Sequence, residues 1–325
     1  MMRRTVCLAD PATPLPALTR AASTAASLGY DGLWTNEAPG RDAFPVLAGF
    51  AAAAPGDTPL GVGVVPVAAR PPLSAAAAAA GLAELARRPI RLGIGSGHAA
   101  ASRRLFGVHL SSPVTAVAEY ATILRRLLDG EAVSFSGAEY AVEGARLLAI
   151  GDRDVRVVVA AMGPRMLETA AATSGGALLN WTAPEVLAGT ARDLRRAAGE
   201  RFLVACYVRV AVDDRRPDVA REVLRREIAS YLRWPAYRAH LARQGHGDVA
   251  TAAGEAWRSG EAAEATATIP DEMVARLGAA GTTAECRAAL ERYESPDVDE
   301  IVIRPVPVGD GGMEAAVAAS APGGS

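Results

Sequence analysis

One segment, residues 155–180, combines a strand-like run with a turn whose residue types suit an anion. Val155–Ala160 is rich in β-branched residues, the pattern of a strand buried on both faces. The turn Met162–Pro164 follows, in which glycine permits close approach of a ligand and proline fits the start of a helix. Free N–H groups at that helix start, with Arg165, could bind a phosphate. An ordinary turn with a solvated Arg165 is the more common outcome on local evidence alone.

Two further residues could transfer protons, and each directly follows a strand-like run. Glu37 comes shortly after Asp31–Thr35, and His98 comes shortly after Ile90–Gly95. A carboxylate or an imidazole in such a place can supply or accept a proton during a reaction. The alternatives are that Glu37 caps a loop and that His98 is structural or solvated.

These segments belong to a regular alternation of strand-like and helix-like patterns. The eight strand-like runs are Thr5–Ala9, Asp31–Thr35, Leu60–Val67, Ile90–Gly95, Val155–Ala160, Ala177–Asn180, Phe202–Val212 and Glu300–Val306. Eight such units over 325 residues predict an α/β fold, a (β/α)₈ TIM barrel, with a doubly wound sheet as the alternative. In a barrel the candidate residues would meet at the carboxyl ends of the strands, where ligands bind.

We expect a single barrel domain over residues 1–308. A hairpin insertion is predicted near 131–140, and a helical and irregular insertion near 235–278. Residues 309–325 are rich in Gly, Ala and Ser and are expected to form a frayed tail.

Within strand Phe202–Val212, Tyr207 and Arg209 share one face because side chains alternate with a period of two. We interpret both as polar filling of the barrel core. The loops 98–111 and 235–270 are expected to form the substrate pocket, and their aromatic and arginine content indicates a partly aromatic, anionic ligand or, equally, helix packing.

Composition excludes several classes of function. All 34 basic residues are arginine, so lysine Schiff-base and P-loop chemistry are absent. The net charge of −2 without a basic run argues against nucleic acid as a partner. The three cysteines form no CxxC pattern and the four histidines no HExxH pattern, so we predict no metal site. Neither a signal peptide nor a membrane span is visible, and we expect a cytoplasmic protein.

Several segments together resemble the luciferase-like monooxygenase superfamily, in the branch that depends on the deazaflavin F420. They include LGYDGLWTNEAPGRDAF (28–44), RLGIGSGHAAASRRLFG (91–107) and VVVAAMGPRMLETAAATSGGALLNWTAPE (157–185). The resemblance covers about residues 28–210 and 270–306, and it lies in the joint order of the segments rather than in one motif.

The resemblance implies a (β/α)₈ barrel with F420, or alternatively FMN, lying across the strand ends. The residues implied for the ring and its ribityl chain are Gly63, Val64, Val65, Ser96 and Gly97. Those implied for the phosphate are Met162, Gly163, Arg165 and Met166. The resemblance also implies a non-prolyl cis peptide bond in the segment that contains Gly63.

Two positions depart from relatives that act on sugar phosphates. Ala38 follows Glu37 where some relatives have His, and His98 stands where some have an acidic residue. That substrate is therefore not predicted.

Three functions follow from this resemblance. The first is an F420-dependent oxidoreductase that transfers hydride to or from a small organic substrate, with His98, or otherwise Glu37, moving the accompanying proton. The second is a monooxygenase that uses reduced FMN and O₂. The third is a non-catalytic barrel that binds a flavin or another ligand. The apolar, Ala-rich helix faces would suit a homodimer.

Overall fold

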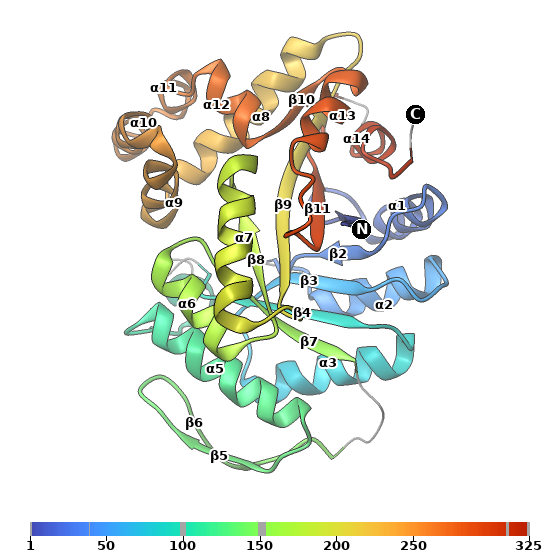
Figure 1. The fold of residues 1–325 in the computed structure, drawn as a ribbon, viewed down its shortest axis with the longest axis vertical. Helices are drawn as coiled ribbons and strands as arrows, with labels where there is room; N and C mark the ends of the chain where they lie inside the picture. Colours follow the sequence, from blue (N-terminus) through green and yellow to red (C-terminus); the bar gives the residue numbers. More distant parts are fainter. Residues whose placement is uncertain (1, 39, 98–101, 149–153, 310–311, 324–325) are drawn as a thin grey trace.

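Eight parallel strands close into a barrel in the computed structural model, which describes residues 2–38, 40–97, 102–148, 154–309 and 312–323 (Figure 1). Around the barrel the order is β1-β2-β3-β4-β7-β8-β9-β11, and pairing of β11 with β1 completes the ring. The strands are β1 (Arg3–Cys7), β2 (Leu33–Thr35), β3 (Leu60–Pro66), β4 (Ile90–Gly95), β7 (Val155–Ala160), β8 (Gly176–Asn180), β9 (Leu203–Val212) and β11 (Glu300–Pro305). The predicted (β/α)₈ barrel is confirmed.

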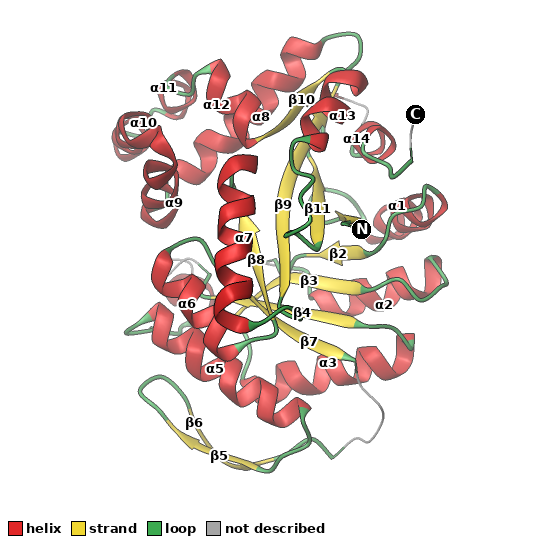
Figure 2. Ribbon diagram, viewed as in Figure 1, coloured by secondary structure: helices red, strands yellow, loops and turns green. Residues whose placement is uncertain are grey.

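Helices alternate with these strands and cover the outside of the barrel (Figure 2). They are α1 (Leu15–Ser27), α2 (Ala43–Ala53), α3 (Pro72–Ala86), α5 (Pro113–Leu128), α6 (Pro164–Thr173), α7 (Pro184–Ala198), α8 (Pro217–Leu232), α13 (Thr283–Glu291) and α14 (Glu314–Ala319). Five of them begin with proline, whose fixed φ suits the first helical position and whose missing N–H has no partner to lose there.

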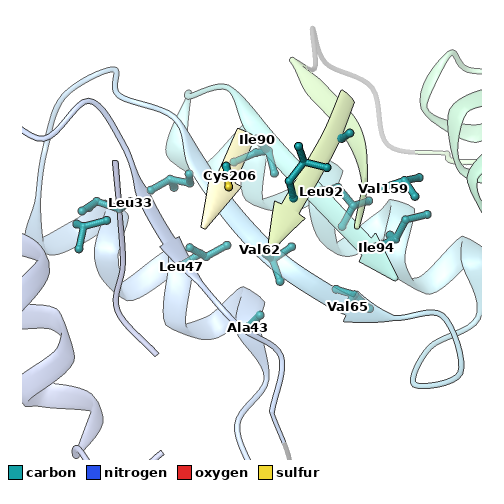
Figure 3. Packing of buried hydrophobic residues seen from close by; sticks show 14 of the residues in the cluster. Leu33, Ala43, Leu47, Val62, Val65, Ile90, Leu92, Ile94, Val159 and Cys206 are labelled. Atoms are coloured by element: carbon teal, nitrogen blue, oxygen red, sulfur yellow. The ribbon is translucent and has the colours of Figure 1, made fainter. Parts of the chain in front are cut away.

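Alternation along β9 shows how the strands separate the outer core from the barrel interior. Val204, Cys206 and Val208 pack outward against the helices, as part of the large apolar cluster that surrounds the barrel (Figure 3). Leu203, Ala205 and Tyr207 lie in a second cluster inside the barrel. Because the period is two, the residues beyond Tyr207 with odd numbers also face inward.

In the amino-terminal half of the barrel interior, an ion pair and a tryptophan side chain connect the strands. Arg91 Nη1 lies 2.5 Å from Glu300 Oε2, and the other carboxylate oxygen of Glu300 accepts a hydrogen bond from Trp34 Nε1 at 2.7 Å. A Cβ on Gly61 would lie 2.2 Å from the Trp34 ring. The missing side chain on β3 therefore makes the space that Trp34 fills.

Two insertions interrupt the regular pattern. The hairpin β5 (Val133–Ser136) and β6 (Ala141–Ala145) projects from one end of the molecule and extends beyond the predicted 131–140 (Figure 1). Between β9 and β11 lie α8, α9 (Pro235–Leu241), α10 (Gly247–Arg258), α11 (Ala262–Ala267), α12 (Asp271–Leu277) and the short strand β10 (Gly278–Gly281). The insertion predicted near 235–278 as helical and irregular is mostly helical, and its longest helix is α10. Its alanines at 250, 253 and 256 are buried and stabilise the helix by packing.

The expected tail is also corrected by the structure. Residues 314–319 form α14, in which Ala316, Val317 and Ala319 are buried in the main apolar cluster. The Val317 carbonyl accepts a hydrogen bond from Tyr30 Oη at 2.7 Å. Small side chains, which made this stretch read as a linker, permit the close packing of α14 against the barrel helices.

Of the helices that the structure describes, none is long and apolar enough to cross a membrane. Among the same residues no group of three or more His, Cys, Asp or Glu side chains is placed to hold a metal ion.

The space at Gly61 can be tested by filling it. We expect Gly61→Ala to lower the free energy of unfolding by about 1–3 kcal/mol, because the rigid Trp34 ring cannot move aside without disturbing its bond to Glu300. The matched control is Gly81→Ala, since Gly81 is exposed in α3 and a Cβ there meets nothing within 4 Å. That variant should be as stable as the parent or more so, by up to about 1 kcal/mol. Equal denaturant midpoints for both variants would contradict the packing described.

Candidate functional site

A cavity of about 300 Å³ opens at the carboxyl ends of the barrel strands. Its lining comes from β3, β4, β7, β8, β9 and β11, from the loops after β2, β4 and β7, and from α8 and α9. The lining residues are Asn36, Glu37, Gly63, Val64, Pro66, Gly95, Ser96, Gly97, Ala160, Met162, Leu178, Asn180, Tyr207, Arg209, Tyr231, Ala236, Tyr237 and Arg304. Barrel proteins bind their ligands at this end, so the cavity is the candidate site.

One wall of the cavity is the backbone of β3 at Gly63 and Val64, whose peptide bond is cis. A Cβ on Gly63 would lie 2.3 Å from Tyr207 Oη, so only glycine leaves room for this hydroxyl. Tyr207 donates to the Gly63 carbonyl at 2.9 Å. The Asn36 amide, turned so that Nδ2 meets acceptors, donates to the same carbonyl at 2.8 Å. Two donors on one oxygen fix the orientation of this wall.

Tyr207 keeps its proton in this position. Burial raises the pKa of its hydroxyl well above the ordinary value, which more than offsets the arginines nearby. The group is therefore a neutral phenol that donates to Gly63 rather than a base.

Four of the five residues assigned to a cofactor ring line the cavity, and Val65 does not. Gly63, Val64, Ser96 and Gly97 are part of the lining. Val65 is fully buried in the outer apolar cluster, where Figure 3 shows it beside Ile94 and Val62. The register of β3 with β4 shifts between Val62 and Val65, which sends the Val65 side chain outward. The assignment of the Val65 side chain to the ring is thus corrected.

Glu37 lies at the cavity with both carboxylate oxygens already engaged. Oε1 accepts from Arg70 Nε at 3.1 Å and Nη2 at 2.8 Å, and Oε2 accepts from the Ala43 backbone N–H at 2.8 Å. Arg70 also lies 2.5 Å from Asp42. The charge of Glu37 is therefore offset by a neighbouring cation and by the start of α2. His98, the other proposed acid/base residue, lies outside the described residues.

The four residues assigned to a phosphate occupy the start of α6 and differ in orientation. Met162 lines the cavity. Gly163 is the N-cap of α6, without a side-chain cap, which leaves the helix start open to a ligand. Arg165 is exposed, and Met166 packs partly against the main apolar cluster instead of facing the turn.

A second arginine, which the sequence did not indicate, lies beside the same turn. Arg243 Nη2 donates to the Met162 carbonyl at 3.2 Å, and it would lie 3.4 Å from a Cβ on Gly163. Arg243 belongs to the helical turn Ala242–His246 that continues α9, so the insertion after β9 brings a positive charge to the start of α6.

His240 of α9 connects this turn to the end of β8. Its Nδ1 lies 2.9 Å from the Met162 carbonyl, and its Nε2 lies 3.0 Å from the Trp181 carbonyl. Gln244 also donates to the Trp181 carbonyl, at 2.8 Å. Burial lowers the pKa of His240 below its ordinary value of 6.5, although the two carbonyls act in the opposite direction. His240 is thus a neutral positioning residue at neutral pH.

The far wall of the cavity carries two arginines. Arg209 of β9 donates to Asn180 Oδ1 and, at 2.9 Å, to Tyr231 Oη, and its guanidinium lies 4.1 Å from the centre of the Trp181 ring. Arg304 of β11 donates to the Ala9 carbonyl at 3.2 Å. The interpretation of Tyr207 and Arg209 as core filling is incomplete, because both line the cavity.

Some of these side chains could have been found from the sequence. Arg304 shares a face with Glu300 and Val302 by the period of two, so the inward face of β11 was readable. Tyr231 and Arg243 gave no such signal, because their approach to the cavity depends on how α8 and α9 fold back over the barrel.

The described part of the chain therefore has the architecture of a ligand-binding (β/α)₈ barrel. The chain belongs to the luciferase-like monooxygenase family, whose family model matches residues 3–300.

Among related sequences, a 5,10-methylenetetrahydromethanopterin reductase of Archaeoglobus fulgidus is 25% identical over 222 residues. That match spans 65% of this chain and 66% of the reductase, just under two thirds of its length.

Among solved structures, the coenzyme F420-dependent tetrahydromethanopterin reductase of Methanopyrus kandleri has a TM-score of 0.77 at 20% identity, covering 99% of this chain and 97% of that one. The oxygenating constituent of 3,6-diketocamphane monooxygenase from Pseudomonas putida, in complex with FMN, has a TM-score of 0.66 at 13% identity, covering 99% and 98%. At these identities the likeness shows the fold. The family model is that of luciferase-like monooxygenases, and the related sequence from Archaeoglobus fulgidus is a reductase.

The hydroxyl of Tyr207 can be tested by its removal. We expect Tyr207→Phe to lower the free energy of unfolding by about 1 kcal/mol, because the Gly63 carbonyl loses one of two donors. The control is Tyr120→Phe, since the buried Tyr120 hydroxyl has no hydrogen-bond partner within the part of the chain that the structure describes. Its removal should leave stability unchanged or raise it. A Tyr207→Phe protein as stable as Tyr120→Phe would show that the hydroxyl does not support the wall.

His240 predicts a specific loss of stability in acid. Above pH 6.5 the residue is neutral in both the folded and the unfolded chain. As the pH falls below 6.5 the unfolded chain takes up a proton first, because burial lowers the pKa of His240 in the folded state, so the free energy of unfolding falls. We expect His240→Asn to show a shallower loss between pH 7 and 5 in urea titrations. Burial also lowers the pKa of His246, but His246 is present in both the parent and His240→Asn. Its contribution therefore cancels when the two pH profiles are compared. Parallel pH profiles would disprove this role for His240.

Proposed function

We propose that this chain is an F420-dependent oxidoreductase that transfers hydride between the deazaflavin and a small organic substrate. The observation that carries the proposal is the position of the bare Gly63-Val64 wall and the uncapped start of α6 at the same cavity. Similarity to the two tetrahydromethanopterin reductases supports F420 as the cofactor.

The residues present suit such a cofactor at both of its ends. A flat ring needs a wall without projecting side chains, and Gly63 and Gly97 supply bare backbone there. A phosphate needs N–H donors and positive charge, and the open start of α6 lies beside Arg243 and Arg165. When bound, F420 supplies hydride chemistry at its ring, while the protein supplies orientation and the exclusion of water.

The proton that accompanies hydride transfer is assigned to His98 or Glu37. Glu37 is held by Arg70 and by the Ala43 N–H, so it is suited to accept or orient a proton rather than to donate one. The donor role therefore falls first to His98, which follows the cavity residues Ser96 and Gly97 in the chain.

The second candidate is a monooxygenase that uses reduced FMN and O₂. It is favoured by the likeness in fold to an FMN-bound monooxygenase. A deazaflavin and a flavin ring have the same shape, and the wall at Gly63-Val64 and the start of α6 suit either one. Turnover without O₂ separates the two candidates, because hydride transfer continues under anaerobic conditions and oxygenation stops.

The third candidate, a barrel that binds without turnover, predicts that His98→Ala and Glu37→Ala leave every measurable function intact. A loss of turnover of tenfold or more at unchanged cofactor affinity, about 1.4 kcal/mol of transition-state stabilisation, would exclude it.

Titration with cofactor tests the proposed function. We expect the purified protein to bind F420 with micromolar affinity, followed by fluorescence. Arg165→Ala and Arg243→Ala should each weaken binding by about 3- to 10-fold, because each removes one charge next to the phosphate. The control is Arg196→Ala, an exposed arginine of α7 paired with Asp193, which should bind as the parent does.

The same titration with FMN can contradict the proposed dependence on F420. Tight binding of FMN with no binding of F420 would replace the proposal with the monooxygenase. Binding of neither cofactor would remove the proposed function and leave the barrel fold intact.

A further inference from the structure

Arg209 and Arg304 lie on neighbouring strands and line the same cavity. They are directly paired in the parallel register of β9 with β11, so their side chains leave the sheet on the same side. Two like charges at paired positions repel each other, and burial strengthens the repulsion because water screens it less. An arrangement of this kind calls for a negative charge between or beside the two guanidinium groups.

Arg209 finds no such charge among the described residues. Its side chain is 3% exposed, and its hydrogen-bond partners Asn180 and Tyr231 are both neutral. Its Nε is buried without a hydrogen-bond partner. The Trp181 ring at 4.1 Å stabilises the cation by stacking but does not neutralise it.

Arg304 likewise forms no salt bridge among the described residues, although the charge of Glu227 on α8 acts on it from beyond salt-bridge distance. Nη2 donates to the neutral Ala9 carbonyl, and Nη1 lies 3.9 Å from Cys7 Sγ. Burial raises the pKa of the Cys7 thiol, so this sulfur is protonated and carries no counter-charge. The guanidinium group keeps its proton under all conditions of interest.

The carboxylate that lines the cavity does not balance these charges. Glu37 already pairs with Arg70 at 2.8 Å, and Arg70 is shared with Asp42. Within the described residues the cavity thus keeps an excess of positive charge on its β9–β11 side. Buried charge without a partner is costly, and natural proteins keep it where a ligand supplies the partner.

We propose that the substrate of this protein is an anion, whose carboxylate or similarly compact oxyanion binds at Arg209 and Arg304. The planar guanidinium group pairs with such oxyanions through two parallel hydrogen bonds, and a single oxyanion next to both groups cancels their repulsion. The aromatic side chains Tyr231 and Tyr237 then contact the body of the substrate. The proposal rests on the proposed function only in treating this cavity as the substrate site.

The experiment uses the protein without cofactor, so that it is independent of the choice between F420 and FMN. Sodium benzoate, sodium acetate and inorganic phosphate are titrated at constant ionic strength by calorimetry, with benzyl alcohol as the neutral counterpart of benzoate. We expect saturable binding of at least one of the anions and none of benzyl alcohol. Arg304→Met should weaken anion binding at least tenfold, whereas the control Arg196→Met should not change it.

Thermal unfolding of the same variants distinguishes a binding arginine from a structural one. Without anion, Arg304→Met should unfold at the same temperature as the parent or higher, because one of two repelling charges is gone. With saturating anion, the parent should gain stability and Arg304→Met should not. If Arg304→Met does not fold, Arg209→Gln provides the same comparison.

Three outcomes would overturn the proposal. In the first, the parent binds none of the anions. In the second, Arg304→Met and Arg209→Gln bind them as the parent does. In the third, these variants weaken only the binding of F420 or FMN, which would assign the positive charge to an anionic part of the cofactor instead. If the anions do not bind but F420 does, the anion site is disproved and the proposed function is retained. If the anions bind but F420 does not, the anion site is retained and the proposed function is disproved.

Discussion

Two missing side chains on β3 determine how the rest of the barrel interior is filled. Without a Cβ at Gly61, the Trp34 ring has room in the barrel interior and reaches Glu300, which in turn pairs with Arg91. Without a Cβ at Gly63, the Tyr207 hydroxyl can reach the backbone of the opposite strand. One strand thus fixes both the packed amino-terminal half and the open carboxyl-terminal half, so the cavity wall is as rigid as the core beneath it.

The two halves also differ in how they treat charge. In the closed half, Glu300 is fully buried, and Arg91 compensates it directly. At the open end, the carboxylate of Glu37 has its own arginine, while Arg209 and Arg304 form hydrogen bonds only with neutral groups among the described residues. The buried charge in the amino-terminal half of the barrel is thus paired, whereas the two arginines in the carboxyl-terminal half have no salt bridge among the described residues. Local rules of stability are most often broken where function requires it, which is why this side of the cavity indicates a ligand.

The sequence predicted the elements well and the site only in part, for identifiable reasons. The helix start at Pro164 and strands such as Val155–Ala160 and Ile90–Gly95 were placed correctly, because proline and β-branched runs act locally. The family resemblance placed Val65 at the cofactor ring, but a register shift on β3 turns its side chain outward, which the sequence did not reveal. The tail was misjudged because alanine and glycine are compatible with a linker and with close helix packing alike. Arg243 and Tyr231 reach the cavity only through the path of a long insertion, about which local patterns say nothing.

That insertion also couples the two ends of the site. Tyr237 and His240 are three residues apart on α9 and therefore lie on the same helical face. Tyr237 lines the cavity near Asn180, to which its hydroxyl is bonded at 3.1 Å, while His240 holds the Met162 carbonyl at the start of α6. A shift of α9 would thus change the cavity wall at Tyr237 and the turn at the start of α6 in a single motion. Because His240 anchors α9 to the backbone carbonyls of Trp181, just after β8, and of Met162, the wall of the cavity at Tyr237 cannot be reshaped independently of the turn at the start of α6.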